Sequence, residues 1–187
     1  MEKILCKLIL SLFILNFPAN IAAKSFENHT NIVIDISEQR LYLLENQDII
    51  QSFPISSSKF GEGSKENSYK TPLGIHSIKE MIGHDVPINT IFISRIDTKR
   101  KAEIIREDHD TDEDYVTSRI LWLDGAEEGI NKGSGIDSFN RYIYIHGTHE
   151  EGLIGQKASH GCIRMFNDDV VLLYNQVKLG TKVYIKA

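Results

Sequence analysis

Cysteine is scarce in this chain, whose 187 residues contain only Cys6 and Cys162. Cys6 lies in an N-terminal stretch that has the features of an export signal, so the exported chain would keep a single thiol. A lone thiol has no internal disulfide partner, which excludes a disulfide-stabilised framework. An unpaired thiol outside the cytoplasm is exposed to oxidants, so its presence favours a role in chemistry over a role in packing.

The chain also lacks an excess of basic residues and, beyond its start, any long apolar run. It carries 21 basic and 26 acidic residues, and without residues 1–23 it would carry 19 and 25. This acidic balance argues against non-specific binding of nucleic acid, which needs a basic face. No segment after residue 23 is apolar for long enough to form a transmembrane helix. We therefore expect no nucleic-acid partner and no stable membrane insertion after the signal is removed.

Residues 1–23 have the three parts of a secretory signal peptide. Lys3 and Lys7 make the start basic, residues 8–17 are apolar, and small residues up to Ala23 form a cleavage site. An apolar run of about ten residues is too short to cross a bilayer as a helix. We predict that this signal is cleaved and that the protein is exported to the periplasm or cell envelope. An uncleaved anchor is the alternative.

The remaining chain is long enough for one domain with a proper core but too short for two large domains. No internal repeat and no linker rich in glycine or proline divides it. The sequence therefore predicts a short N-terminal lead over residues 24–30 and a single domain over residues 31–186.

Short β-rich runs, separated by polar turns, dominate the predicted domain. The predicted strands cover residues 32–36, 40–44, 49–55, 74–78, 91–96, 119–123, 141–145 and 181–185. The first three are expected to form an antiparallel meander. The charged segment 97–114 is predicted to be a solvated loop or a short exposed helix, with a substrate-facing lid as the alternative.

A change of hydrophobic period after the second cysteine predicts one late helix. Asn167 can cap its start, and Asp168 and Asp169 suit the positive end of its dipole. Gly180 suits its exit. The sequence alone thus predicts a mostly β domain with one late helix.

Candidates for a thiol-based acyl-transfer site lie between residues 144 and 164. Such a site needs a thiolate, a base that makes it, a group that orients the base, and donors for a developing oxyanion. Cys162 supplies the thiol. His146 comes at the end of a predicted strand, so its ring can take the proton from Cys162 and lower the effective thiol pKa. Gly147 would let the chain turn and pass close to the site.

The turn around Cys162 offers the remaining parts. Successive backbone N–H groups of His160, Gly161 and Cys162 can point at one spot, as an oxyanion hole requires. A structural role for the His160 ring inside the turn is the alternative. Arg164 can bind a carboxylate through two hydrogen bonds, and pairing with an aspartate at the start of the predicted helix is its alternative.

Metal binding is a separate hypothesis for the same side chains. A zinc site made of His146, His149, His160 and Cys162 matches no ribbon or finger spacing and would occupy the thiolate that the chemistry needs. His149 is interpreted as a solvated loop residue. We therefore predict no metal and no other cofactor.

These residues resemble the signature of a known family. The run Ser159 to Met165, with His146-Gly147-Thr148 upstream, is similar to the signature of the YkuD-type L,D-transpeptidases. In that family a histidine is followed further along the chain by Ser/Thr-His-Gly-Cys and then by Arg or Asn. Thr71-Pro72-Leu73-Gly74 resembles an upstream element of the family. The resemblance covers approximately residues 30–186.

The resemblance implies a β-sandwich catalytic domain, with one or two short helices, that acts on peptidoglycan stem peptides. Cys162 would be the nucleophile, and His146 would accept and return the proton. The residues implied to orient the base or form the oxyanion hole are Gly147, His160 and Gly161, and those implied to bind substrate are Arg164 and Ser159.

The implied reaction begins with attack of Cys162 on the L-centre carbonyl of the third stem residue, usually diaminopimelate, and expels the terminal D-Ala. The thioester then passes to an amine of a neighbouring stem and forms a cross-link between third residues. An L,D-carboxypeptidase that uses water as acceptor and a non-catalytic wall-binding module are the alternatives. If His146 generates the thiolate, acylation is expected to rise with pH.

Overall fold

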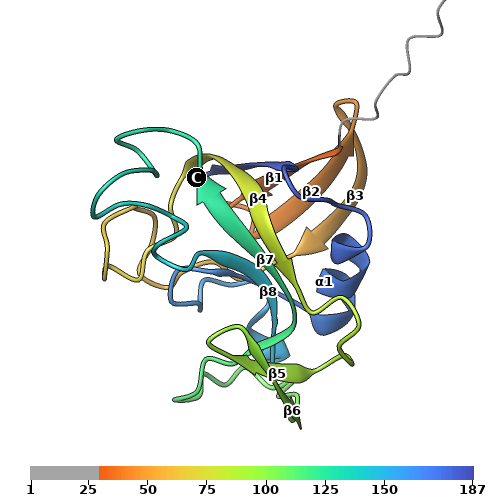
Figure 1. Ribbon diagram of the computed structural model, residues 1–187. Helices are drawn as coiled ribbons and strands as arrows, with labels where there is room; N and C mark the ends of the chain where they lie inside the picture. Colours follow the sequence, from red (N-terminus) through yellow and green to blue (C-terminus); the bar gives the residue numbers. More distant parts are fainter. Residues whose placement is uncertain (1–29) are drawn as a thin grey trace, which may run out of the picture.

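The computed structural model describes residues 30–187 and consists mostly of strands (Figure 1). The strands are β1 (Thr30–Asp35), β2 (Arg40–Glu45), β3 (Asp48–Pro54), β4 (Gly74–Ile82), β5 (Thr90–Ile93), β6 (Ile96–Lys101), β7 (Val116–Gly125), β8 (Tyr144–Thr148), β9 (Ile163–Met165) and β10 (Lys182–Lys186), and the helices are η1 (Glu151–Leu153, 3-10) and α1 (Asn167–Tyr174). The predicted mostly β fold with one or two short helices is confirmed. The predicted signal peptide, residues 1–23, lies outside the described residues, as do residues 24–29 of the predicted lead.

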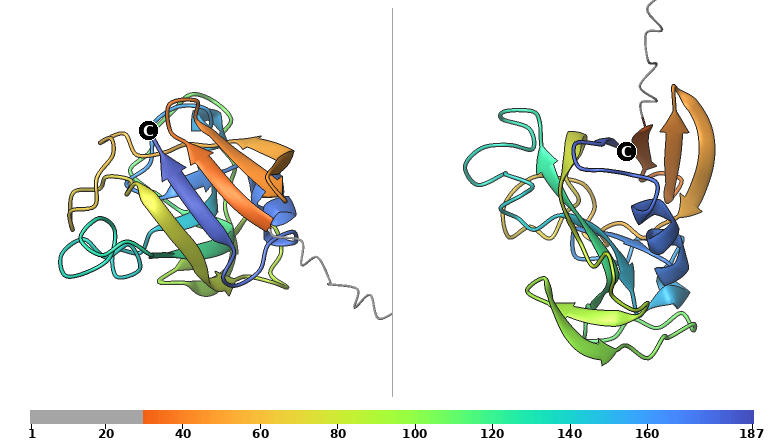
Figure 2. Two further views of the ribbon diagram at one scale, coloured as in Figure 1. Left: turned by 90° about the horizontal axis from the view of Figure 1, so that it is seen from above. Right: turned by 45° about the vertical axis from the view of Figure 1, so that its right-hand side comes forward.

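The ten strands form one mixed sheet in the order β3-β2-β1-β10-β4-β7-β5-β6, with β8 beside β7 and β9 beside β8. The predicted antiparallel meander is confirmed, because β1 pairs with β2 and β2 pairs with β3. β10 lies between β1, which it meets in parallel, and β4, which it meets antiparallel (Figure 2). The end of the chain therefore joins the meander to the rest of the sheet.

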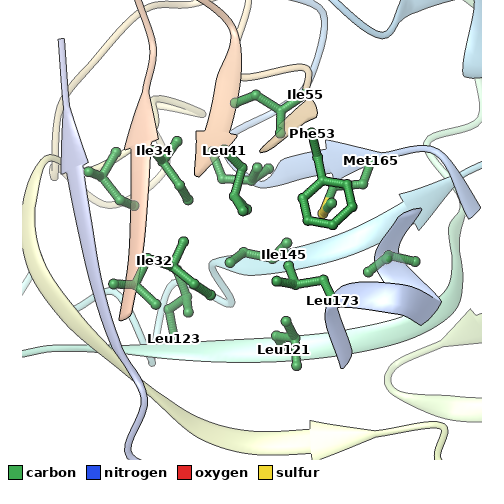
Figure 3. Close-up of a cluster of buried hydrophobic side chains, with 14 of the residues drawn as sticks. Ile32, Ile34, Leu41, Phe53, Ile55, Leu121, Leu123, Ile145, Met165 and Leu173 are labelled. Carbon is green, nitrogen blue, oxygen red and sulfur yellow. The ribbon is translucent and has the colours of Figure 1, made fainter. Parts of the chain in front are cut away.

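The sheet bends so that β1, β2 and β3 face β7, β8 and β9 across a hydrophobic core (Figure 3). Alternate side chains of the first two strands, such as Ile32 and Leu41, are buried in the same cluster as Leu121 of β7 and Ile145 of β8. Leu173 of α1 closes one side of this cluster. Because strand side chains alternate between faces, the period of two in the sequence supplies this inner surface. The core anchors β8 and β9, which carry the candidate site.

The predicted strand over residues 91–96 is wrong, because the chain reverses inside it. β5 ends at Ile93 and β6 begins at Ile96, and the residues between them, Ser94 and Arg95, have φ angles of 48° and 68°. A two-residue turn with positive φ at both positions matches the twist of paired strands. The usual sequence signals for it, Asn-Gly or Asp-Gly, are missing here. β6 also replaces the first part of the predicted loop or exposed helix at 97–114.

The predicted late helix is confirmed, but Asn167 does not cap it. Phe166 occupies the cap position, without a side-chain hydrogen bond. The buried Asn167 amide instead donates to the Thr148 carbonyl at 2.7 Å and accepts from the Thr117 and Ser118 hydroxyls, each at 2.6 Å. An Asn at a helix start can therefore serve tertiary packing, and here it ties α1 to β7 and β8.

Two further features place the candidate site. β8 begins at Tyr144, later than predicted, and continues through Thr148, so His146 lies inside the strand and not beyond its end. Two long loops, residues 55–73 and 126–143, project together beside this region (Figure 1), and the Glu66 N–H donates to the Gly135 carbonyl at 2.7 Å. Within residues 30–187, no helix is long and apolar enough to cross a membrane.

Candidate active site

Cys162 lies at the margin of the sheet, immediately before β9. β9 runs parallel to β8, and their register places Arg164 opposite His146. The half-buried thiol donates to the Tyr142 carbonyl at 3.3 Å and accepts from the Tyr144 N–H at 3.4 Å. The short parallel pairing therefore brings the two predicted catalytic residues, Cys162 and His146, into one corner of the fold.

An aromatic cluster forms one wall around the thiol. Cys162 packs against the buried cluster that contains Trp122 and Tyr144. Trp122 stacks on Phe139 with a centroid separation of 4.0 Å, and Arg95 donates to the Tyr144 hydroxyl at 3.2 Å. Loss of water contact in this setting raises the pKa of Cys162 to about 12. The thiol is therefore protonated at neutral pH in the free protein and needs a base before it can attack.

His146 has the form that a general base requires. It is 1% exposed, and its Nδ1 lies 2.6 Å from the Gly147 carbonyl oxygen. A carbonyl oxygen only accepts, so Nδ1 carries the ring proton and Nε2 keeps its lone pair. Burial lowers the pKa of His146 to about 4, although Asp114 and the Gly147 carbonyl act in the opposite direction. At neutral pH the ring is neutral, with one fixed tautomer.

The thiol and the imidazole do not share a hydrogen bond in this arrangement of residues 30–187. The Sγ–H of Cys162 is directed at the Tyr142 carbonyl. Rotation of the cysteine side chain between staggered positions moves Sγ without any backbone change. The geometry therefore describes a resting pair of neutral groups, in which the thiol must leave Tyr142 before His146 can accept its proton.

Ser159 holds the turn that precedes the thiol. Its hydroxyl donates to the Cys162 carbonyl at 2.6 Å and accepts from the Gly161 N–H at 3.3 Å. Gly161 has a φ of +121°, which favours glycine, and its carbonyl accepts from the Thr71 hydroxyl at 3.1 Å. Ser159 is fully buried, so these contacts are those of a residue that shapes the turn. Direct binding of substrate by Ser159 stays a prediction.

Arg164 is buried between two carboxylates. Its Nη1 lies 2.8 Å from Glu150 Oε2, and its Nη2 lies 2.7 Å from Asp114 Oδ1. Arg164 is 1% exposed and Glu150 is 0% exposed. The alternative partners at the start of the helix, Asp168 and Asp169, take no part in these pairs. The guanidinium charge is thus matched within the protein, and its binding of a substrate carboxylate stays a prediction.

We expect substitution of Arg164 by methionine to lower the free energy of unfolding by about 3–5 kcal/mol, because it leaves buried Glu150 without a counter-charge. Urea denaturation followed by circular dichroism measures this change. Lys157→Met is the matched control, since it removes a 2.6 Å ion pair with Glu62 that is partly exposed to water. Such a pair contributes about 0–1 kcal/mol. Equal losses in the two variants would contradict the assignment of a buried charge network.

Close packing explains the glycine at position 147. A Cβ atom there would lie 2.5 Å from Asn167 Oδ1 and 2.9 Å from the Thr117 carbonyl oxygen. Any larger residue would push the strand away from these groups and move the Gly147 carbonyl that orients His146. The glycine therefore serves a close approach inside β8, and not a turn after the strand as the sequence predicted.

The two other histidines of the proposed zinc set lie in different surroundings. His160 is partly exposed, and its Nδ1 lies 2.8 Å from Asp114 Oδ2. His149 is 4% exposed, and its ring lies 4.7 Å from that of Tyr115. Its interpretation as a solvated loop residue is wrong, because the segment before β7 covers it. Within the described part of the chain, no group of three or more His, Cys, Asp or Glu side chains is arranged to hold a metal ion.

Sequence reasoning missed the two carboxylates that hold Arg164. Asp114 ends a charged segment far from the cysteine motif, and nothing in the sequence distinguishes it from nearby Asp110 or Asp112. Glu150 follows the His146 run closely, but acidic residues are usually exposed. Only the packing of residues 102–115 against the end of β8 brings both to the site.

A pocket opens between the two long loops and is lined in part by Tyr142, whose carbonyl accepts from the thiol. Its volume is about 160 Å³, and its lining includes Glu66, Tyr69, Asn140, Arg141, Tyr142 and His160. A second pocket of about 370 Å³ shares Glu66, Asn140 and Arg141 with it and continues past the 133–137 loop. The Arg141 side chain donates to the Lys70 carbonyl at 2.7 Å. We call these two adjoining pockets the groove, and Tyr142 lines the smaller of them.

A mostly β domain with a thiol immediately before one strand and a buried, oriented histidine on the neighbouring strand defines a candidate acyl-transfer protein. The chain matches the model of the YkuD family, the L,D-transpeptidase catalytic domain, over residues 29–185. It belongs to this family.

Curated relatives carry the same family name. The probable L,D-transpeptidase ErfK/SrfK of Escherichia coli (strain K12) is 24% identical over 157 residues, which cover 82% of this chain and 43% of the relative. The putative L,D-transpeptidase YqjB of Bacillus subtilis (strain 168) is 51% identical over 45 residues, which cover 24% of this chain and 26% of the relative. The matched region thus spans less than half the length of these relatives.

Solved structures share the fold. An L,D-transpeptidase from Mycobacterium smegmatis superposes with a TM-score of 0.54 at 17% identity, over 86% of this chain and 59% of that one. L,D-transpeptidase 3 from Mycobacterium tuberculosis, in complex with a faropenem-derived adduct, superposes with a TM-score of 0.52 at 18% identity, over 86% of this chain and 61% of that one. The YkuD-type fold predicted from the sequence is confirmed.

Proposed function

We propose that this protein is a peptidoglycan L,D-transpeptidase that uses Cys162 as its nucleophile. Cys162 attacks the L-centre carbonyl of the third residue of a tetrapeptide stem, such as diaminopimelate, and displaces the terminal D-Ala. An amine of a neighbouring stem then attacks the thioester and regenerates the thiol. The observation that carries this proposal is the fixed tautomer of His146, on the strand that neighbours the one after Cys162, in a chain that belongs to the L,D-transpeptidase family.

Proton movement in the proposed reaction runs through His146 Nε2. As the S–C bond forms, the proton of Cys162 moves to Nε2, and it then passes to the D-Ala nitrogen as the C–N bond breaks. Deacylation reverses these roles, because the attacking amine gives a proton to Nε2 and the departing sulfur takes one back. The Gly147 carbonyl supports both steps by holding the Nδ1 proton in place.

The turn before β9 is proposed to stabilise the oxyanion. The Gly161 N–H already has an acceptor in the Ser159 hydroxyl, although at 3.3 Å the bond is long. We therefore assign the main donor role to the backbone N–H of Cys162, with His160 and Gly161 as its neighbours in the turn. In this assignment Ser159 is a positioning residue, because its hydroxyl also fixes the Cys162 carbonyl.

The groove between the two long loops is proposed to receive the donor stem. Arg141, a cation, and Glu66, an acid, each line both pockets of the groove. A diaminopimelate side chain bears both an ammonium and a carboxylate, so opposite charges along one groove suit it. Peptidoglycan lies outside the cytoplasmic membrane, and we accordingly propose export to the periplasm or cell envelope.

Incubation of the purified protein with a disaccharide tetrapeptide tests the proposed function. We expect cross-linked dimers and released D-Ala, both measured by mass spectrometry. Tripeptide products without dimers would favour the L,D-carboxypeptidase. Absence of both products would contradict the proposal that the protein is an enzyme. Co-sedimentation of such an inactive protein with intact peptidoglycan would favour the wall-binding module.

A further inference from the structure

Asp114 contacts both Arg164 and His160 although it lies outside the cysteine motif. Its Oδ2 lies 2.8 Å from His160 Nδ1, and its Oδ1 lies 2.7 Å from Arg164 Nη2. Its side chain is 32% exposed, so the carboxylate keeps some contact with water. Burial raises the pKa of Asp114, but Arg164 and the histidines of the site outweigh this and hold the pKa below its usual value. Asp114 is therefore ionised at neutral pH.

The segment that carries Asp114, residues 102–115, is fixed to the end of β8. The Ile105 N–H donates to the His149 carbonyl at 2.8 Å. The N–H and the hydroxyl of Thr111 donate to Glu150 Oε1 at 2.6 Å and 2.7 Å. The segment is thus one wall of the site, and the position of Asp114 follows from these contacts and not from a chance side-chain orientation.

The charges around Arg164 leave a net negative charge at the site. One guanidinium lies between two carboxylates, those of Glu150 and Asp114. Arg164 is the register partner of His146 on the neighbouring strand, so the surplus charge lies next to the candidate base. The titratable and charged groups that act on or lie against His146 are Asp114, Arg164 and the Tyr144 phenol, whose ring centroid lies 6.4 Å away. Of these, Asp114 favours the protonated ring and Arg164 opposes it.

We propose that Asp114 is a positioning residue that holds Arg164 and His160 in place and supplies a fixed counter-charge while His146 carries the proton. This inference rests on the proposed function. During acylation the ring gains a proton from Cys162 as the S–C bond forms, and in the resulting tetrahedral intermediate the sulfur is a neutral thioether. The imidazolium then has no thiolate partner, and Asp114 stabilises it until the proton leaves with the D-Ala amine.

The same carboxylate opposes ionisation of the thiol in the free protein. Its negative charge raises the pKa of Cys162, after the larger effect of burial. Removal of the charge therefore has two opposite effects on reactivity. A reagent that needs only the thiolate reacts faster, whereas an acylating agent whose reaction requires His146 to accept and carry the thiol proton reacts more slowly. A residue that merely shaped the segment would change both rates in the same direction.

The test compares two reagents on the full chain and on its Asp114→Asn variant. Faropenem acylation at pH 7.5 is followed by intact-protein mass spectrometry, and it is expected to fall about tenfold, the effect of one pKa unit. Iodoacetamide alkylation at pH 9.5 is expected to rise by about two- to tenfold. Asp112→Asn is the matched control, because it removes the same charge from the same segment and has no contact with the site residues. Both of its rates are expected to stay within about twofold of wild type.

Three results would overturn the inference. Asp114→Asn could match Asp112→Asn in both assays, both of its rates could fall together, or a folded Asp114→Glu variant, which keeps the charge, could acylate as slowly as Asp114→Asn. If the Asp114→Asn variant does not unfold cooperatively, the acylation rate of Asp114→Glu is compared with that of Asp112→Asn instead. A clearly slower rate for a folded Asp114→Glu variant would then overturn the inference. Failure of the proposed function is distinct, since the wild type itself would then neither turn over tetrapeptide nor react with faropenem.

Discussion

Substitution of Cys162 by alanine is expected to abolish release of D-Ala and formation of cross-linked dimers, with a loss of more than about 10⁴-fold. Alanine offers no atom that can carry the acyl group, so only substrate binding and the oxyanion donors remain. The disaccharide tetrapeptide assay measures the products, and intact mass after incubation with faropenem shows whether an adduct still forms. The fold should survive, because the half-buried thiol makes only two long hydrogen bonds, at 3.3 Å and 3.4 Å.

Cys162→Ser is the control for this experiment. Its hydroxyl can keep the contact with the Tyr142 carbonyl, but it is a much weaker nucleophile than a thiol at the same base. We expect a similarly large loss of activity and a free energy of unfolding within about 1 kcal/mol of wild type. Dimers formed at wild-type rate by either variant would show that acyl transfer does not pass through this residue.

Substitution of His146 by glutamine is expected to lower the acylation rate by about 10²–10⁴-fold, the usual contribution of a general base. The pH profile of the wild type is the more specific measurement. From the sequence alone, acylation is expected to rise with pH, and a flat rate from about pH 5 to 9 would count against the pair. The structure corrects this expectation, because burial lowers the pKa of His146 to about 4 and places the rise near pH 4. Since the pKa of Cys162 is about 12, both groups stay neutral between pH 5 and pH 9. We therefore expect a plateau across that range.

The same pKa shift makes a prediction about stability. An unfolded histidine binds a proton below about pH 6.5, whereas folded His146 stays neutral down to about pH 4. Unfolding therefore takes up a proton between these values, and stability falls as the pH falls. His146→Gln should remove up to about 3 kcal/mol of this acid sensitivity. Urea titrations at pH 7 and pH 4.5 measure how much the free energy of unfolding falls between the two pH values. An equal fall in wild type and variant would contradict the buried neutral ring.

Much of the fold could be predicted from short runs of sequence. The meander of β1, β2 and β3, the final strand and the late helix all follow from local periodicity, because strand and helix patterns repeat within a few residues. The hairpin at Ser94 and Arg95 could not be predicted, since two ordinary polar residues adopt positive φ there under the control of the strands on either side. The role of Asn167 could not be predicted either. An asparagine that caps a helix and one that forms buried hydrogen bonds to distant strands cannot be distinguished by sequence.

The sequence by itself determined the family, the mostly β class and the candidate pair of Cys162 and His146, because the motif and the strand periods are local. The tertiary structure alone decided the state of that pair. It fixes the tautomer of His146 through Gly147 and makes both groups neutral through burial. It also surrounds Arg164 with Glu150 and Asp114. Burial and charge pairing depend on which distant segments pack together, and no spacing along the chain encodes either quantity.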